Sequence, residues 1–259
     1  MIKEEIRFED SNIMEGMVSF RAVIDSMTKK PQGYDRRINK LYFDSSKVKK
    51  LASHLSYIKA MSYKFGFEIC PVSSQTIDGM TIGSSHGGIV FECTQRSIPS
   101  LDSYPLRDNG FAVILDGVED PYNFGFAARS LYAAGVDLLL LPERNWMSAA
   151  GVVCRSSAGA SELMDMAIFD PATFSDILHQ KDYKIVCAEL ENSSSCYECD
   201  LSKPVCLVIG GERRGISSVI KSQCDSFVRI EYGRDFPAAL SATGAATVLA
   251  FEVLRQSKK

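Results

Sequence analysis

The segment "LVIGGERRGIS", from Leu207 to Ser217, combines residue types that suit the binding of a small molecule. An apolar run of the kind that forms a buried strand leads into two glycines, a glutamate, two arginines and a third glycine. Glycine carries no β-carbon, so a ligand can approach its backbone closely. The segment therefore predicts a ligand-binding loop at the end of a strand.

Two familiar nucleotide-binding loops do not fit this segment. A P-loop needs Lys and Ser or Thr after its last glycine, whereas Gly215 is followed by Ile216. The dinucleotide fingerprint G-x-G-x-x-G does not match the spacing of Gly210, Gly211 and Gly215. A plain turn that needs positive φ stays open as an alternative, although it explains one or two glycines and not the Glu-Arg-Arg between them.

A second candidate segment is "LDGVEDPYNFGFAARSLYAAG", which places Asn123 at the start of a predicted helix and Arg129 six residues later, on a different face. Helix capping is the simpler interpretation of Asn123. Arg129 stands among small and apolar residues, so its guanidinium must find an anion.

The second half of the chain alternates apolar strand patterns with helical patterns. We expect strands over residues 111–118, 137–142, 164–170, 184–190, 204–210 and 226–232, helical stretches between them, and a final helix from Pro237. Apolar strands separated by helices are typical of an α/β fold with a mostly parallel sheet covered on both faces. Ligands bind such sheets outside the carboxyl ends of the strands, where the glycine loop begins.

The first half predicts a smaller α/β module. Helices are expected over residues 13–27, 45–66 and 74–79, the second opened by a Ser cap and ended by Gly66, and strands over 38–44, 67–72 and 87–95. A stretch rich in Pro, Ser and Asp then suggests a linker. We expect a small domain over residues 1–97, a linker over 98–109 and a second domain over 110–259.

Composition narrows the function classes. Hydrophobic residues make up 46% of the 259, and the formal net charge is −3, so any nucleic-acid contact must be local. No apolar run approaches the roughly 18 residues of a membrane helix, so we expect a cytoplasmic protein without membrane contact. The 8 cysteines mostly lie in apolar runs and are expected to be buried thiols. "CYEC", Cys196 to Cys199, lacks the further ligands that zinc needs, and no metal is expected.

Three motifs occur in order between Gly110 and Gln256: "NFGFAAR", "GGERRG", and "RIEYGRDFPAALSATGAATVLAFEVLRQ". In this order and spacing they resemble the SpoU, or TrmH-like, branch of the SPOUT family of RNA ribose 2′-O-methyltransferases. The first half, with "MEGMVSFRAVIDSM" and "GSSHGGIVFE", resembles the small substrate-binding domain of that family.

The resemblance implies a C-terminal trefoil knot whose loops bind S-adenosylmethionine. Carried over to this chain, the cofactor-binding positions are Gly210, Gly211, Ile230 and Leu240. The bare glycines would then let the cofactor lie against the backbone. The resemblance also implies a homodimer built around the final helix, with structured RNA, either rRNA or tRNA, as the substrate.

The same resemblance assigns the chemistry to Arg129, with Asn123, Glu212 and Ser241 beside it. A guanidinium is almost always protonated, so Arg129 is expected to clamp a phosphate of the target nucleotide and not to act as a base. Family geometry further suggests that Arg129 completes the site of the partner chain.

One motif departs from the family pattern. Ala239-Leu240-Ser241 stands where the family usually has Ser-Leu-Asn, which removes one polar side chain and shortens another. A catalytically weak or inactive RNA-binding protein is therefore kept as the alternative function. For the RNA contact itself, the basic run "KKPQGYDRR", from Lys29 to Arg37, is the candidate, and a solvated loop is its simpler interpretation.

Overall fold

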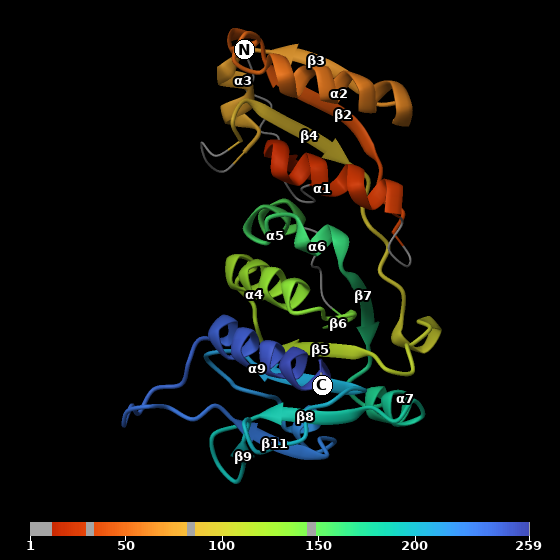
Figure 1. Ribbon diagram of the computed structural model, residues 1–259. Coiled ribbons are helices and arrows are strands. Elements are labelled where there is room, and N and C mark those ends of the chain that lie inside the picture. Colours follow the sequence, from red (N-terminus) through yellow and green to blue (C-terminus); the bar gives the residue numbers. More distant parts are fainter. Residues whose placement is uncertain (1–11, 30–33, 82–85, 144–148, 259) are drawn as a thin grey trace. The chain divides into compact units, whose positions relative to one another are not determined.

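The computed structural model describes residues 12–29, 34–81, 86–143 and 149–258. They form two compact units (Figure 1). Described residues between 12 and 97 and between 149 and 163 make the first unit, and those over 98–143 and 164–258 make the second. Within the described ranges no helix is long and apolar enough to cross a membrane.

The first unit contains a four-stranded sheet of order β1-β4-β2-β3, in which β2 and β3 are parallel and β4 is antiparallel to β1 and β2. Its elements are β1 (Ile13–Glu15), α1 (Gly16–Lys29), β2 (Ile38–Asp44), α2 (Ala52–Phe65), β3 (Glu68–Val72), α3 (Ser74–Gly79), β4 (Ile89–Cys93), α5 (Ala150–Ser156) and α6 (Ala160–Leu163). The core centres on Phe20, whose ring meets Phe67 and Phe91 edge-on.

The predicted helix over residues 45–66 is shorter than expected. A 3₁₀ turn, Ser45–Lys47, comes first and is capped by the carboxylate of Asp44, so the predicted Ser cap is wrong. Helix α2 then begins at Ala52, after Leu51, which makes no side-chain cap. The predicted end is confirmed, because Gly66 adopts φ 79° and donates its N–H to the carbonyl of Ser62.

Helices α5 and α6 belong to the first unit although they lie between two strands of the second along the chain. Cys154 of α5 is fully buried among the apolar residues of the first unit. Residues 149–163 therefore return from the second half of the sequence to complete the core of the first.

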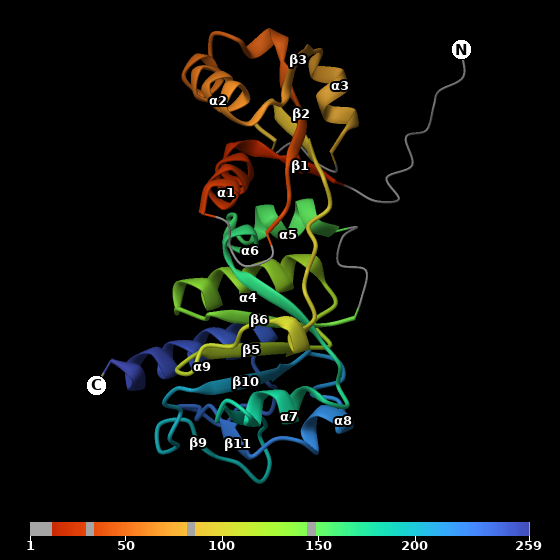
Figure 2. The same cartoon turned by 90° about the vertical axis from the view of Figure 1, so that its right-hand side faces the viewer.

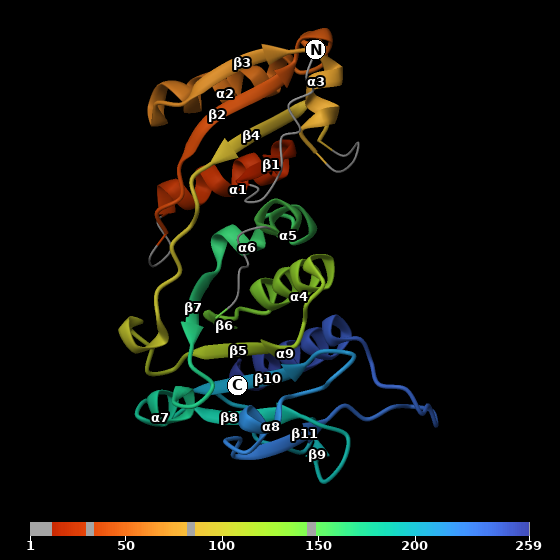
Figure 3. The same cartoon turned by 180° about the vertical axis from the view of Figure 1, so that it is seen from behind.

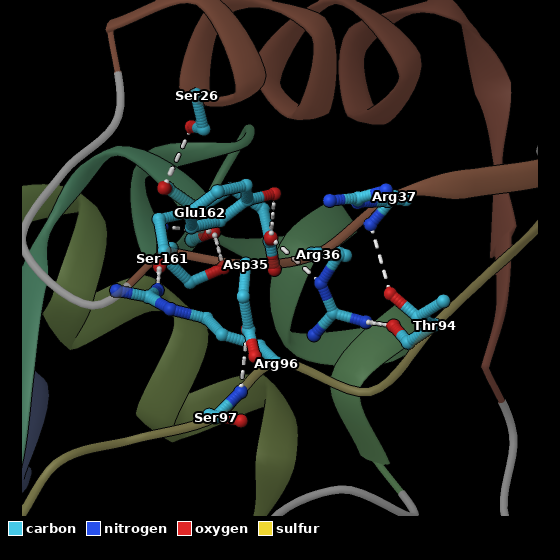
Figure 4. Close-up of polar contacts among 11 residues, drawn as sticks. Ser26, Asp35, Arg36, Arg37, Thr94, Arg96, Ser97, Ser161 and Glu162 are labelled. Atoms are coloured by element: carbon cyan, nitrogen blue, oxygen red, sulfur yellow. Dashed lines mark hydrogen bonds and ion pairs between the residues drawn. The ribbon is translucent and has the colours of Figure 1, made fainter. Parts of the chain in front are cut away.

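A buried polar cluster fixes α6 to the first unit (Figure 4). The Glu162 carboxylate lies 3.0 Å from Nε of Arg36 and accepts a hydrogen bond of 2.8 Å from the hydroxyl of Tyr34. Arg36 also donates to the carbonyl of Thr94, and Arg96 donates to the carbonyl of Ser161. Because these donors and acceptors satisfy one another, charged groups can be buried here without isolation from a partner.

This cluster corrects the predicted RNA contact. Arg36 is only 3% exposed and is committed to Glu162, so it cannot serve as a surface phosphate ligand. Lys30, also in the predicted basic run, lies outside the described residues. Of the four cations in that run, Lys29 and Arg37 are the ones that the structure describes on the surface.

The second unit is built on seven parallel strands in the order β7-β6-β5-β10-β8-β11-β9, as the predicted α/β fold requires. The strands are β5 (Phe111–Asp116), β6 (Leu138–Pro142), β7 (Asp165–Phe169), β8 (Lys184–Ala188), β9 (Ser194–Ser195), β10 (Val205–Gly210) and β11 (Ser226–Arg229). The helices are α4 (Pro121–Ala133), α7 (Phe174–His179), α8 (Ser218–Lys221) and α9 (Ala242–Ser257).

Helices cover both faces of this sheet (Figure 2). Ala112 and Ile114 of β5 point to the face where Phe174 and Leu178 of α7 pack. Figure 3 shows α4 and α9 side by side on the other face, where the alternate residues of the strands point. The chain leaves β5 toward β6 on one side and returns as β10 on the other. Their carboxyl ends therefore form a topological switch point.

Several further details differ from the expectations. The predicted helix over residues 13–27 is preceded by strand β1, because Ile13–Glu15 pair with β4. Helix α9 begins at Ala242 and not at Pro237, and β9 was not predicted. Cys187 and Cys224 form a disulfide, so the expectation of free thiols is wrong for this pair. Their Cα atoms, 6.1 Å apart, come together because strand β8 lies beside the turn after α8. The trefoil knot stays a prediction.

Candidate functional site

The glycine loop is anchored where β10 ends next to β5. Gly210 lies opposite Asp116 in the sheet, and the N–H of Gly211 donates to the carbonyl of Asp116 over 2.6 Å. The carboxylate of Asp116 accepts a second hydrogen bond of 2.6 Å from the N–H of Ser217. Asp116 thus holds both ends of the loop. Sequence analysis missed this residue, although an acid directly after an apolar strand was a signal for it.

The structure explains in another way why positions 210 and 211 are glycine, which the sequence analysis attributed to the approach of a cofactor. A β-carbon on Gly210 would lie 2.5 Å from the carbonyl carbon of Gly215, and one on Gly211 would lie 2.2 Å from the carbonyl oxygen of Gly117. Both clashes are with backbone, which cannot move aside as a side chain can. The glycines are therefore needed for the loop to close on itself and on β5, and this need does not depend on a cofactor.

We expect Gly211→Ala to destabilise the second unit by about 1–3 kcal/mol, because the added carbon forces the loop off the end of β5. Gly233→Ala is the matched control, since nothing lies within 4 Å of its β-position and its φ is not positive. Urea unfolding followed by circular dichroism measures both. Equal stabilities of the two variants would contradict the steric argument.

The four predicted cofactor positions line one cavity. Gly210, Gly211, Ile230 and Leu240 all border a space of about 360 Å³ between the ends of β10 and β11 and the start of α9. Apolar side chains make much of its wall: Ile209, Ile216, Val228 and Leu249. Three carboxylates, Glu189, Glu191 and Glu212, stand at the same cavity with one guanidinium, that of Arg229, and Glu189 is paired with Lys221 over 2.9 Å.

A second cavity, of about 460 Å³, adjoins the first and shares Gly211, Glu212 and Ala242 with it. Asn123 lines this space together with Arg213 and Arg214 of the glycine loop. Sequence analysis gave these two arginines no role of their own. Two adjacent guanidinium groups inside a ligand-binding loop were the signal that could have identified them as anion ligands.

Asn123 is not the cap of α4. The cap is Asp120, whose carboxylate accepts a hydrogen bond of 2.8 Å from the N–H of Asn123, the third residue of the helix. The carbonyl of Asn123 accepts a hydrogen bond of 3.1 Å from the hydroxyl of Thr243 in α9. Both of these hydrogen bonds use backbone atoms of Asn123. Its side chain can therefore serve the cavity that it lines.

Arg129 lies on the exposed side of α4 and borders neither cavity. Its guanidinium forms no ion pair with any residue that the structure describes. The structure therefore brings Asn123 and Glu212 together with the cofactor positions, but it does not bring Arg129 to them within one chain.

Ser241 caps α9. Its hydroxyl accepts a hydrogen bond of 3.1 Å from the N–H of Gly244. Just before it, the N–H of Leu240 donates to the hydroxyl of Tyr232 over 3.0 Å, which fixes the irregular segment between β11 and α9. Ser241 thus has a structural role as the cap of α9, and its catalytic role stays a prediction.

The first cavity fits a cofactor with an apolar ring and a positive centre. Its apolar walls suit an adenine ring, and its carboxylates suit the cationic sulfonium and ammonium groups of S-adenosylmethionine. Among the described residues, no three His, Cys, Asp or Glu side chains lie close enough together to hold a metal ion.

The sequence profile of the SpoU rRNA Methylase family matches residues 110–251, more than half of the chain. The chain belongs to this SpoU family. The matched segment contains both cavities, the glycine loop and every predicted site residue.

Two curated rRNA methyltransferases are similar to the chain over most of their length. The chain is 30% identical over 212 residues to the 23S rRNA (guanosine-2′-O-)-methyltransferase RlmB of Xylella fastidiosa, covering 79% of this chain and 84% of that protein. RlmB of Shewanella oneidensis is 29% identical over 199 residues, with 75% and 80% covered.

Solved structures share the fold. The AdoMet-bound rRNA methyltransferase of Sinorhizobium meliloti superposes with a TM-score of 0.74 at 22% identity, covering 94% of this chain and 86% of that one. The SpoU methyltransferase AviRb of Streptomyces viridochromogenes gives a TM-score of 0.72 at 20% identity, with 94% and 88% covered. The predicted fold class, a mostly parallel α/β sheet joined to a small α/β unit, is confirmed.

Proposed function

We propose that this protein transfers a methyl group from S-adenosylmethionine to a ribose 2′-hydroxyl in structured RNA, either rRNA or tRNA, in the cytoplasm. One observation carries the proposal: within the segment that matches the SpoU family, the apolar cavity at Gly210, Ile230 and Leu240 adjoins a cavity that presents Asn123 and two arginines. A cofactor and a nucleotide can therefore meet at the shared wall, at Gly211 and Glu212.

In the first cavity the chain would bind and orient the cofactor. Backbone at Gly210, Ile230 and Leu240 offers hydrogen-bonding groups at the rim, and the apolar walls exclude water. When bound, S-adenosylmethionine supplies an electrophilic methyl group. Glu212 stands in both cavities and orients groups on either side of the shared wall.

In the second cavity the chain would hold the nucleotide. Arg213 and Arg214 suit a backbone phosphate, because a guanidinium donates two parallel hydrogen bonds to phosphate oxygens. Asn123 can accept from or donate to a ribose hydroxyl. A positive charge near the 2′-oxygen lowers the cost of removing its proton, and this is the role we assign to Arg129.

We propose that Arg129 reaches this site from a partner chain in a homodimer. Four large apolar side chains are exposed on α4 and α9: Tyr122 at 41%, Phe126 at 47%, Tyr132 at 41% and Phe251 at 44%. The exposed residues of α4 lie on the helix that carries Arg129. Phe251 lies on α9, whose first residue, Ala242, borders the first cavity. By contrast, Leu249 and Val253 of α9 are buried within their own chain, so only the outer side of α9 is available to a partner.

Two measurements test the proposed function. Calorimetry should detect binding of S-adenosylmethionine at micromolar to millimolar concentration, and mapping of ribose methylation in cells with and without the gene should reveal a site that depends on this protein. RNA binding without cofactor binding would instead establish the alternative, an inactive RNA-binding SpoU protein.

A further prediction concerns the departure at Ala239 and Ser241. Restoring the family pattern with Ala239→Ser and Ser241→Asn should raise methyl transfer, because a longer amide side chain at 241 regains reach toward the substrate. The cap of α9 should survive, since Asn caps helices as well as Ser does. Single-turnover rates on the mapped RNA decide the matter; a lower rate with unchanged stability would mean that the two residues are adapted to another target geometry.

A further inference from the structure

The first unit carries a strongly basic segment that the proposed methyl transfer does not use. Between Ser45 and Phe67 the chain has five lysines and no Asp or Glu, although the whole protein has 32 acidic residues against 29 Lys and Arg. Helix α2 occupies most of this segment. Its buried face is made by Leu55 and Ile58, so Lys59 and Lys64 point to solvent.

An aromatic side chain stands among these lysines. Tyr63 is 95% exposed, follows Lys59 by one helical turn and is adjacent to Lys64. Tyr57, the other tyrosine of α2, packs edge-on against Phe20 with ring centroids 6.1 Å apart. Burial therefore explains Tyr57 but not Tyr63, whose ring is available to stack on a flat group from outside.

The carboxyl end of α2 opens into a cavity of about 480 Å³ within the first unit. Lys64 and Phe65 form one side of it, and Tyr34, Arg37 and Met27 belong to its remaining wall. The ammonium group of Lys64 lies 4.9 Å from the centre of the Phe65 ring. The cavity thus offers an aromatic face and cations within one space of nucleotide size.

The cavity carries a small net positive charge. Arg36 is paired with Glu162, and Asp35, which accepts the N–H of Ser97 over 2.8 Å, keeps its negative charge and offsets one of the two remaining cations, Arg37 and Lys64 (Figure 4). The guanidinium of Arg37 and the ammonium groups of Lys59 and Lys64 have no carboxylate partner among the residues that the structure describes.

We propose that the outer face of α2 and the cavity at its end bind a single-stranded segment of the RNA. Phosphates would lie on Lys59, Lys64 and Arg37, and bases would stack on Tyr63 and Phe65. Unstacked bases are what aromatic side chains recognise in RNA, whereas a duplex hides them. The proposal rests on the proposed function in that it takes RNA as the substrate.

The test measures binding of the full-length protein to a fluorescent 20-nucleotide oligouridine, a 20-base-pair RNA duplex and polyglutamate across a salt series. The main variant combines Arg37→Gln, Lys59→Gln and Lys64→Gln. Its matched control removes three cations of the second unit, Arg107→Gln, Lys181→Gln and Lys184→Gln, which are paired with carboxylates. Tyr63→Ala tests stacking alone.

The main variant should bind oligouridine at least tenfold more weakly and lower the slope of log K against log salt by about 2, since each lost phosphate contact on a single strand accounts for about 0.7. Tyr63→Ala should weaken oligouridine binding by about tenfold and leave duplex binding within about twofold. The control variant should retain oligouridine affinity within about threefold.

Equal losses in the main variant and the control would overturn the proposal. So would polyglutamate binding as tight as oligouridine with no effect of Tyr63→Ala, which would mark α2 as a surface for an acidic protein. The substituted side chains are exposed apart from Lys184, which is half-buried, and thermal melting checks that each variant folds. Cofactor calorimetry on the same samples keeps the two proposals apart, because oligouridine binding requires neither cofactor nor catalysis.

Discussion

Replacing Arg129 by Ala should lower the rate of RNA methylation by about 10²–10³-fold, the usual loss when one group that stabilises transition-state charge is removed. Affinity for S-adenosylmethionine should stay within about twofold, because Arg129 is exposed on α4 and borders neither cavity of its own chain. Single-turnover kinetics and calorimetry measure the two effects. A variant that loses cofactor affinity as well would contradict this placement of Arg129.

Mixed dimers test whether Arg129 serves the partner chain. The second variant needs a blocked cofactor cavity in a folded protein, and Gly210→Val is unsuitable because a β-carbon there meets backbone at 2.5 Å. Leu240→Trp is preferable, since Leu240 lines the cavity and is 39% exposed. Each homodimer should be inactive. In a mixed dimer one site combines an open cavity with an intact Arg129, so about half of the normal activity should return.

Co-expression with two affinity tags isolates the mixed dimer. If mixed dimers form but stay inactive, Arg129 acts within its own chain and the shared-site proposal is wrong. If the chain purifies as a monomer that methylates RNA, both the homodimer and the shared site are wrong.

The second large effect should come from the buried pair in the first unit. Glu162→Ala leaves the guanidinium of Arg36, 2% exposed, without its carboxylate, and should destabilise the first unit by about 3–5 kcal/mol. Burial lowers the pKa of Arg36, but the Glu162 carboxylate and smaller contributions from other neighbours together more than offset this, so the pKa stays above its ordinary value and the side chain stays charged. Tyr34 would lose its acceptor in the same variant.

Urea unfolding and hydrogen exchange of amides in α1 and β2 measure this loss. Asp108→Ala is the control, because its pair with Lys181 is exposed and should contribute less than about 1 kcal/mol. The double variant Arg36→Met and Glu162→Met should recover most of the stability, since apolar side chains of similar volume can replace a buried ion pair. A loss for Glu162→Ala no larger than for Asp108→Ala would contradict the assignment.

Local patterns were sufficient for most of the secondary structure and for the parallel sheet. Continuous apolar runs such as Phe111–Asp116 and Val205–Gly210 are strands because both of their faces are covered, and covered strands need no polar alternation. The motif residues at 210, 211, 230 and 240 predicted one cavity because the loops at the carboxyl ends of parallel strands gather at the same edge of the sheet.

The first residues of the helices were harder to predict where more than one residue could serve as the N-terminal cap. Asp120, and not Asn123, caps α4, although both residue types cap helices well. Helix α9 begins at Ala242 because Ser241 satisfies its first N–H groups, whereas the apolar pattern that starts at Pro237 is equally compatible with an earlier start.

The sequence by itself determined which residue types stand at the ends of the strands, and hence the family, the sheet and the cavity at the ends of β10 and β11. Only the tertiary structure decided that α5 and α6 join the first unit, that Arg36 is buried against Glu162, and that Gly210 and Gly211 are required by neighbouring backbone. The physical reason is that strand and helix patterns depend on neighbours along the chain. A buried ion pair joining residues 36 and 162, or a backbone contact joining residues 117 and 211, depends on neighbours in space that no local pattern records.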